Sequence, residues 1–156
     1  MPVTSQASPE LIETVYHPMA GAGGSIIDIE KFNLWYGDKQ ALFDNTMGIE
    51  MGLVTALIGP SGCGKSTLLR SLNRMNDLID GLRLSGEVRL EGADIYHRDI
   101  DVIGLRKRMG MVFQKPNPFP MTIADNVTYP LKVDGVRDRR APPETAERAL
   151  HAAALQ

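Results

Sequence analysis

The chain has 156 residues, of which 43% are apolar and 23% are charged, and its 17 Lys and Arg against 19 Asp and Glu give a net charge of −2. This composition is that of a soluble globular protein, and it excludes a fibrous protein, a disordered chain and a disulfide scaffold. The near-neutral charge gives no bulk attraction to nucleic acid, and no apolar run approaches the ~20 residues that span a bilayer.

The first segment, residues 1–24, contains several prolines and glycines and ends in Gly21-Ala22-Gly23-Gly24. It has too little apolar surface to offset the entropy of ordering, so we expect a flexible leader. Apolar residues then alternate over 25–36 with one slip of phase, which predicts a half-buried strand with a bulge.

A turn at Gly37-Asp38-Lys39 leads into two short predicted strands, 40–43 and 46–50, so an antiparallel sheet opens the domain. The next run, Leu53 to Ile58, is almost continuously apolar, which is typical of a strand covered on both faces. The later patterns predict a helix over 65–75, a strand over 86–90, a helix over 100–108, a buried strand over 110–113, an extended proline-rich loop over 115–120, and helices over 122–129 and 144–155.

The most informative segment lies between the predicted strand at 53–58 and the predicted helix at 65–75. It reads Gly59-Pro60-Ser61-Gly62-Cys63-Gly64-Lys65-Ser66-Thr67 and satisfies G-x-x-x-x-G-K-[ST] in the strand–loop–helix context that the motif requires. Glycines at 59, 62 and 64 let successive backbone N–H groups point inward around a polyphosphate. The start of the following helix favours the same anion.

Three side chains at the end of this loop have predicted roles. Lys65 should place its ammonium against the β- and γ-phosphates of a nucleotide, and Ser66 should offer its hydroxyl to Mg²⁺. Thr67 should donate to the region of the α-phosphate. The segment therefore predicts a site for a nucleoside triphosphate with Mg²⁺.

Flanking segments narrow the class of protein. The loop at 59–67, the segment Phe32-Asn33-Leu34-Trp35-Tyr36-Gly37 and the segment Met111-Val112-Phe113-Gln114 together resemble ATP-binding-cassette transporter ATPases. The resemblance implies that Tyr36 places its ring on adenine. It also implies that Gln114 approaches Mg²⁺ and the attacking water and couples the site to membrane subunits.

The same resemblance implies an α/β fold of the P-loop NTPase type, in which a RecA-like parallel sheet is joined to an N-terminal antiparallel β subdomain. Residues 25–156 would then be the N-terminal part of an ATP-binding domain. Within it, 25–114 would form the nucleotide-binding core, and 115–156 would form the exit of the glutamine loop and the start of a helical subdomain.

The similarity is sharper after Gln114. The run Gln114-Lys115-Pro116-Asn117-Pro118-Phe119-Pro120 and the run Ile123-Ala124-Asp125-Asn126-Val127 resemble the ATPase subunit of bacterial phosphate-import transporters. This likeness implies a subunit that binds ATP and energises the import of inorganic phosphate. It implies integral-membrane permease subunits as partners, a homodimer of the full-length domain, and a peripheral place on the cytoplasmic face of the inner membrane.

Two segments of the family pattern do not follow Gln114: the Leu-Ser-Gly-Gly-Gln signature and an apolar run ending in Asp-Glu. The similar Leu84-Ser85-Gly86-Glu87 precedes Gln114, and His151 lies in an alanine-rich helical pattern rather than after a strand. We therefore expect an incomplete domain that does not turn over ATP alone. The alternatives are a cassette ATPase for another solute such as an amino acid, a P-loop kinase or switch protein, and a non-catalytic binding fragment.

Overall fold

The computed structural model describes residues 24–135 and 141–153. The predicted leader therefore lies, apart from Gly24, outside the described residues. The chain divides between Met111 and Val112 into two compact units, and each unit is described by itself.

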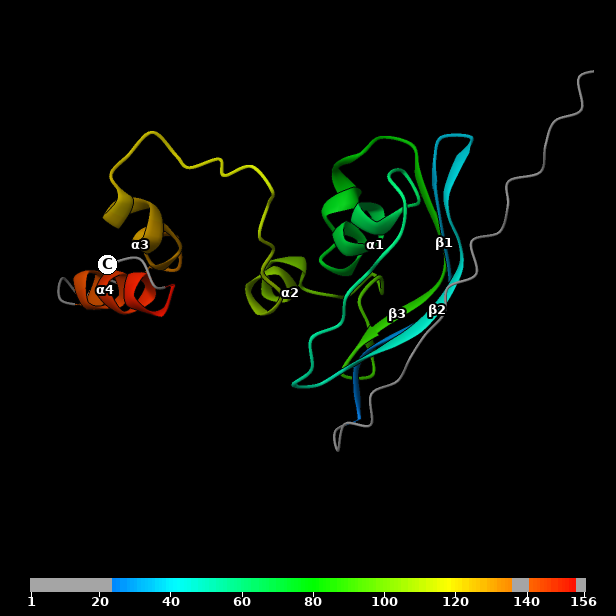
Figure 1. Ribbon diagram of the computed structural model, residues 1–156, viewed down its shortest axis with the longest axis horizontal. Coiled ribbons are helices and arrows are strands. Elements are labelled where there is room, and N and C mark those ends of the chain that lie inside the picture. The colour runs from blue at the N-terminus through cyan, green and yellow to red at the C-terminus, as the bar shows by residue number, and fades with distance from the viewer. Residues whose placement is uncertain (1–23, 136–140, 154–156) are drawn as a thin grey trace, which may run out of the picture. The chain divides into compact units, whose positions relative to one another are not determined.

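The first unit is built on an antiparallel sheet (Figure 1). Its strands are β1 (Ser25–Tyr36), β2 (Lys39–Glu50), β3 (Leu82–Leu90) and β4 (Ala93–Asp94), in the order β2-β1-β3-β4. The predicted antiparallel opening of the domain is confirmed. The two short strands expected at 40–43 and 46–50 form the single strand β2. Asp44, between them, has a φ of 48° and stays within the strand, and its N–H donates to Asn33 Oδ1 at 2.8 Å.

The predicted slip of phase in β1 is a bulge at Lys31, whose φ is 46°. Ile27 and Ile29 are buried before it, and Phe32 and Leu34 are buried after it. The bulge moves the register by one residue, so apolar side chains on both sides of Lys31 contribute to one core.

Helix α1 (Lys65–Leu72) lies beside the sheet in Figure 1. It packs Leu68 and Leu72 into this core. It ends earlier than the predicted range of 65–75, because Arg74 takes a left-handed conformation with φ 59° that stops the helix. The 3₁₀ helix η1 (Met75–Leu78) and the helix α2 (Val102–Arg108) follow in the chain. Asp101 caps the start of α2, because its carboxylate accepts from the Ile103 N–H at 3.0 Å.

Two predicted strands are wrong. Residues 53–58 and 110–113 form no strand in the structure, and Val54, Ile58 and Val112 are 98%, 94% and 98% exposed. An apolar run favours burial, but a strand also needs a neighbour for its backbone N–H and C=O groups. Within the described residues the sheet pairs only β1 to β4, so neither run has such a neighbour. Leu57 alone packs against the core.

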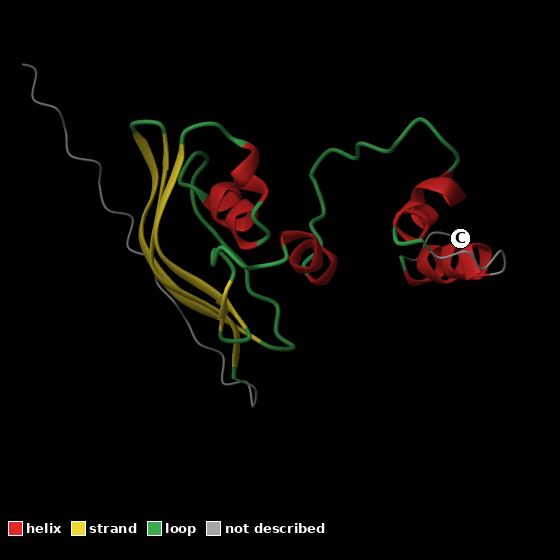
Figure 2. Cartoon of the chain, turned by 180° about the vertical axis from the view of Figure 1, so that it is seen from behind, coloured by secondary structure: helices red, strands yellow, loops and turns green. Residues whose placement is uncertain are grey.

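The second unit contains the helices α3 (Ile123–Val133) and α4 (Ala141–Ala152), drawn red in Figure 2. Thr122 caps α3 by accepting from the Asp125 N–H at 3.1 Å. Lys132 donates to Asp125 at 2.6 Å, and this hydrogen bond holds the pKa of the Asp125 carboxyl below its usual value. None of the helices within 24–135 and 141–153 is long and apolar enough to span a bilayer.

The predicted irregular loop at 115–120 is confirmed, and the side chain of Asn126 ties its end to α3. The Asn126 amide donates to Phe119 O at 3.1 Å, and its carbonyl accepts from the Phe119 N–H at 2.8 Å. The Phe119 ring lies 4.8 Å from the ring of Tyr129, centroid to centroid. The loop and the first turns of α3 are therefore held together locally.

Gly86 of β3 faces the bulge and offers a test of the sheet. Its φ is 84°, and a Cβ there would collide with the backbone of Lys31, whereas Gly92 has a similar φ of 80° and nothing within 4 Å. We expect Gly86→Ala to lower the free energy of unfolding by more than ~2 kcal/mol, and Gly92→Ala by only ~1 kcal/mol. Urea denaturation of both variants measures the difference, and equal losses would contradict the close approach at the bulge.

Candidate nucleotide-binding site

The predicted phosphate loop, residues 59–67, leads directly into α1. Gly62 and Gly64 have φ values of 83° and 96°, conformations that L side chains rarely adopt. The helix begins immediately after them, with the Leu68 N–H donating to Gly64 O at 2.8 Å. The backbone N–H groups of the first helical turn, which have no partner within the helix, therefore start at Lys65.

Gly64 is required for two separate reasons. Its φ favours glycine, and an added Cβ would lie 2.9 Å from Leu42 Cδ2 and 3.0 Å from Ala41 O. The N-terminus of α1 can approach strand β2 this closely only because residue 64 has no side chain. The loop is thus fixed against the sheet at the point where a phosphate would meet the helix.

The ammonium of Lys65 lies over the start of the loop. It donates to Gly59 O at 2.8 Å and to Pro60 O at 2.6 Å, and it lies 3.4 Å from Cys63 Sγ. These contacts hold one positive charge among backbone groups of the loop. A phosphate oxygen offers the same ammonium a charged acceptor, which makes a stronger hydrogen bond than a carbonyl.

Ser66 is exposed and Thr67 is half-buried in the first turn of α1. The Thr67 carbonyl accepts from the Ser71 hydroxyl at 2.8 Å and from the Asn76 amide at 2.9 Å. The role of Ser66 toward Mg²⁺, and that of Thr67 toward the α-phosphate, stay predictions.

Tyr36 is the last residue of β1 and is half-buried. Its hydroxyl donates to Asn76 Oδ1 at 3.1 Å, so the ring is held at its outer end. Because Asn76 also bonds to the Thr67 carbonyl, one side chain links Tyr36 to the phosphate loop. The contact of Tyr36 with adenine stays a prediction.

Gln114 lies in the second unit and is exposed, in a stretch without regular structure. The phosphate loop lies in the first unit. The structure therefore links Tyr36 to Thr67 of the loop through Asn76, and the approach of Gln114 to the Mg²⁺ site stays a prediction.

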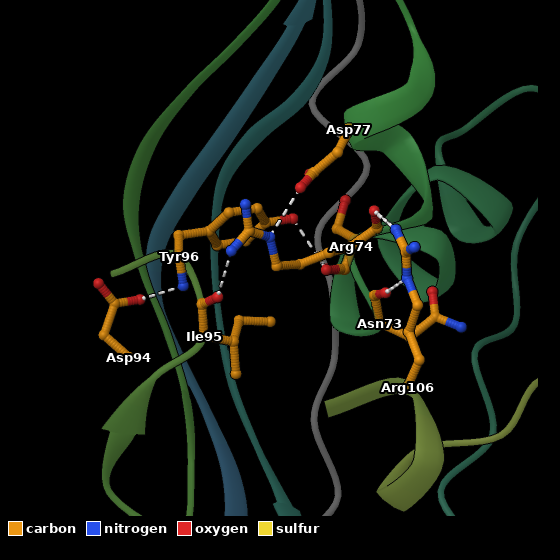
Figure 3. A network of polar contacts seen from close by, with 8 residues as sticks. Asn73, Arg74, Asp77, Asp94, Ile95, Tyr96 and Arg106 are labelled. Carbon is orange, nitrogen blue, oxygen red and sulfur yellow. Dashed lines mark hydrogen bonds and ion pairs between the residues drawn. The ribbon is translucent and has the colours of Figure 1, made fainter. Parts of the chain in front are cut away.

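A polar network at the C-terminal end of α1 (Figure 3) is not indicated by any sequence pattern. The Tyr96 hydroxyl donates to Ser71 O at 2.8 Å, and burial raises the pKa of Tyr96 above its usual value. Arg74 lies over the Tyr96 ring at 5.3 Å and donates to Asp77 at 2.7 Å. Arg106 of α2 donates to the carbonyls of the residues at 73 and 74. These contacts join segments distant in sequence, which no local pattern reveals.

Neither a cluster of metal ligands nor the apolar cavity beside α1 offers a rival site within the described residues. No group of three or more His, Cys, Asp or Glu within 24–135 and 141–153 could hold a metal ion. A cavity of about 120 Å³ between the sheet and α1 is lined by seven apolar residues and Thr55, so it provides no charge for an anion. The phosphate loop is therefore the candidate site.

Comparison with known proteins decides the class. A family model described as ABC transporter matches residues 42–156. The chain belongs to the ABC transporter family. It is 59% identical over 129 residues to a phosphate import ATP-binding protein PstB of Colwellia psychrerythraea, which covers 83% of this chain and 46% of that protein. It is 57% identical over 129 residues to PstB 1 of Vibrio cholerae, covering 83% and 47%.

A solved structure is also similar. It is a bacterial Atm1-family ABC exporter with ATP bound, at a TM-score of 0.58 and 29% identity, covering 71% of this chain and 18% of that one. The chain thus contains part of a P-loop ATPase domain with an antiparallel N-terminal sheet. The alternative of a P-loop kinase or switch protein is therefore excluded. The chain spans about half the length of the curated PstB proteins that it matches.

Cys63 provides a direct test of the site. It is exposed, it is the one cysteine of the sequence, and its Sγ lies inside the loop beside Lys65. We expect saturating Mg-ATP to slow maleimide labelling severalfold, because a polyphosphate in the loop covers the thiol. In Lys65→Ala the protection should disappear at the same nucleotide concentration. Equal labelling rates with and without nucleotide would contradict this placement of the loop.

Proposed function

We propose that this chain is the ATP-binding part of an ABC ATPase that energises the import of inorganic phosphate. The single observation that carries the proposal is the glycine-shaped loop at 59–67, anchored on β2 and holding the Lys65 ammonium. The solute is supported by the 57–59% identity to proteins named as phosphate import ATP-binding proteins. The phosphate that is imported is distinct from the phosphates of ATP that the loop would bind.

The loop would bind ATP through its backbone N–H groups and through the first turn of α1. Lys65 would exchange the carbonyls of Gly59 and Pro60 for the β- and γ-phosphates, and Ser66 would offer its hydroxyl to Mg²⁺. Tyr36 would stack on adenine. Gln114 would approach Mg²⁺ and the attacking water, which makes Lys65 and Gln114 the candidate catalytic residues of this chain.

In the whole protein we expect a RecA-like parallel sheet that includes residues 53–58 and 110–113. Both runs are apolar and exposed in this structure, so neighbouring strands would bury them. We also expect a homodimer of the full-length domain, in which the signature of one copy faces the phosphate loop of the other.

The partners that we propose are the integral-membrane permease subunits of the importer, contacted through the region of Gln114 and the proline-rich loop at 115–120. The ATPase would then lie on the cytoplasmic face of the inner membrane as a peripheral subunit. An ABC ATPase for another solute, such as an amino acid, is the alternative, since the phosphate loop itself does not select the solute.

We expect this chain to differ in its ability to bind ATP and its ability to hydrolyse it. We expect residues 1–156 to bind Mg-ATP weakly and not to turn it over, because the signature and the acidic pair do not occur after Gln114. Calorimetry should detect binding that Lys65→Ala abolishes, since the ammonium is then lost from the loop. Multiple turnovers by the purified chain that depend on Lys65 would contradict the expectation, and calorimetry on a version extended by roughly 100 residues measures what the added segment supplies.

The solute can be tested through the membrane partner. We expect the extended chain to co-purify with the permease subunits of a phosphate importer and not with those of an amino-acid importer, because coupling surfaces are specific to their partners. Tagged permease pairs of both kinds, expressed with the same ATPase, provide the comparison. Retention by the amino-acid permease alone would favour the alternative.

A further inference from the structure

We propose that Asn76 is a positioning residue that holds the Tyr36 ring for the base of the nucleotide. The inference rests on the proposed function, since it concerns the same ATP site. Asn76 belongs to η1 and has no exposed surface. It lies outside the phosphate motif and outside the predicted strand that carries Tyr36.

The polar ends of Asn76 are both used. Its Oδ1 accepts from the Tyr36 hydroxyl at 3.1 Å. Its Nδ2 donates to Thr67 O at 2.9 Å and to Ser71 Oγ at 2.8 Å. A buried amide is costly unless it is hydrogen-bonded in this way. One side chain therefore joins the end of β1 to the first turn and the last turn of α1.

This link connects the two predicted contacts of one nucleotide. Tyr36 is the candidate for the base, and Thr67 closes the motif that is the candidate for the phosphates. The link between them passes through only two hydrogen bonds, although the residues are 31 positions apart, from 36 to 67. A fixed spacing between base and phosphate subsites lowers the ordering cost of binding a ligand that must reach both.

The acceptor end of Asn76 distinguishes positioning from simple support of α1. The Thr67 carbonyl already accepts from the Ser71 hydroxyl, so it keeps a partner without Asn76. The Oδ1 atom, in contrast, has Tyr36 as its partner. The Tyr36 hydroxyl donates its hydrogen to Asn76 Oδ1. The ring is therefore left to contact a ligand through its face rather than through that hydrogen bond, which fits stacking on a base.

The test compares Mg-ATP with Mg-tripolyphosphate, which has the phosphates but no base, by calorimetry on the full chain. We expect Tyr36→Phe to weaken Mg-ATP binding about fivefold, the usual effect of one lost hydrogen bond. Asn76→Ala also loses the two hydrogen bonds from Nδ2 to α1, so it should weaken Mg-ATP binding at least as much. Both variants should leave the affinity for Mg-tripolyphosphate unchanged. The double variant should bind Mg-ATP no more weakly than Asn76→Ala alone, since Asn76→Ala already removes the hydrogen bond that Tyr36→Phe removes. Tyr36→Phe loses one hydroxyl only, so it serves if Asn76→Ala does not fold.

Asn73→Ala is the matched control. Asn73 is the residue after α1, is only 5% exposed, and has a side-chain Oδ1 without a hydrogen-bond partner. Its truncation should leave the ratio of the two affinities at the wild-type value. The same loss in Asn73→Ala, an equal loss of both ligands in Asn76→Ala, or no loss in Tyr36→Phe would overturn the positioning role.

The wild-type chain separates the two proposals. If it binds both ligands but Mg-ATP no more tightly than Mg-tripolyphosphate, there is no base contact, and the positioning role fails while the phosphate loop stands. If it binds neither ligand, the proposed function itself fails, and the role of Asn76 fails with it.

Discussion

The close approach of Gly64 to β2 is the contact on which the candidate site depends. An added Cβ would meet Leu42 and the backbone of Ala41, so the loop reaches the sheet only through a residue without a side chain. Behind it, Leu68 and Leu72 carry α1 into the core. The helix start is thereby set in place by apolar packing, and the loop receives its backbone donors in a fixed direction.

The C-terminal end of α1 is also held by polar contacts. Tyr96 donates to Ser71 O, and Arg74 lies between the Tyr96 ring and Asp77 (Figure 3). Arg106 joins α2 to the backbone just after α1. Helix carbonyls at this end lack partners within the helix, so donors from other segments both satisfy them and fix the position of the helix. Apolar packing along α1 and hydrogen bonding at its C-terminal end thus restrain this short helix together.

The sequence predicted correctly those structural features that neighbouring residues determine. The bulge in β1 followed from the slip between Ile29 and Phe32, and the turn from strand-like residues into α1 followed from the glycines and Lys65. It failed at 53–58 and 110–113, because an apolar run reports a preference for burial and not the presence of a neighbouring strand. It also missed Asn76, whose importance comes from its contacts with Tyr36 and Thr67 rather than from any pattern around it.

The two sides of the phosphate loop differ in how firmly they are held. On the helix side, Gly64 and the core residues of α1 fix the backbone. On the side that precedes the loop, residues 53–58 form no strand and are mostly exposed. There Lys65 donates to the carbonyls of Gly59 and Pro60. A polyphosphate must therefore replace the carbonyls at Lys65 as it binds, and that cost is subtracted from its affinity. Burial of 53–58 between neighbouring strands would hold this side of the loop as the core holds the helix side, so the affinity for ATP would then depend on the sheet as well as on the motif.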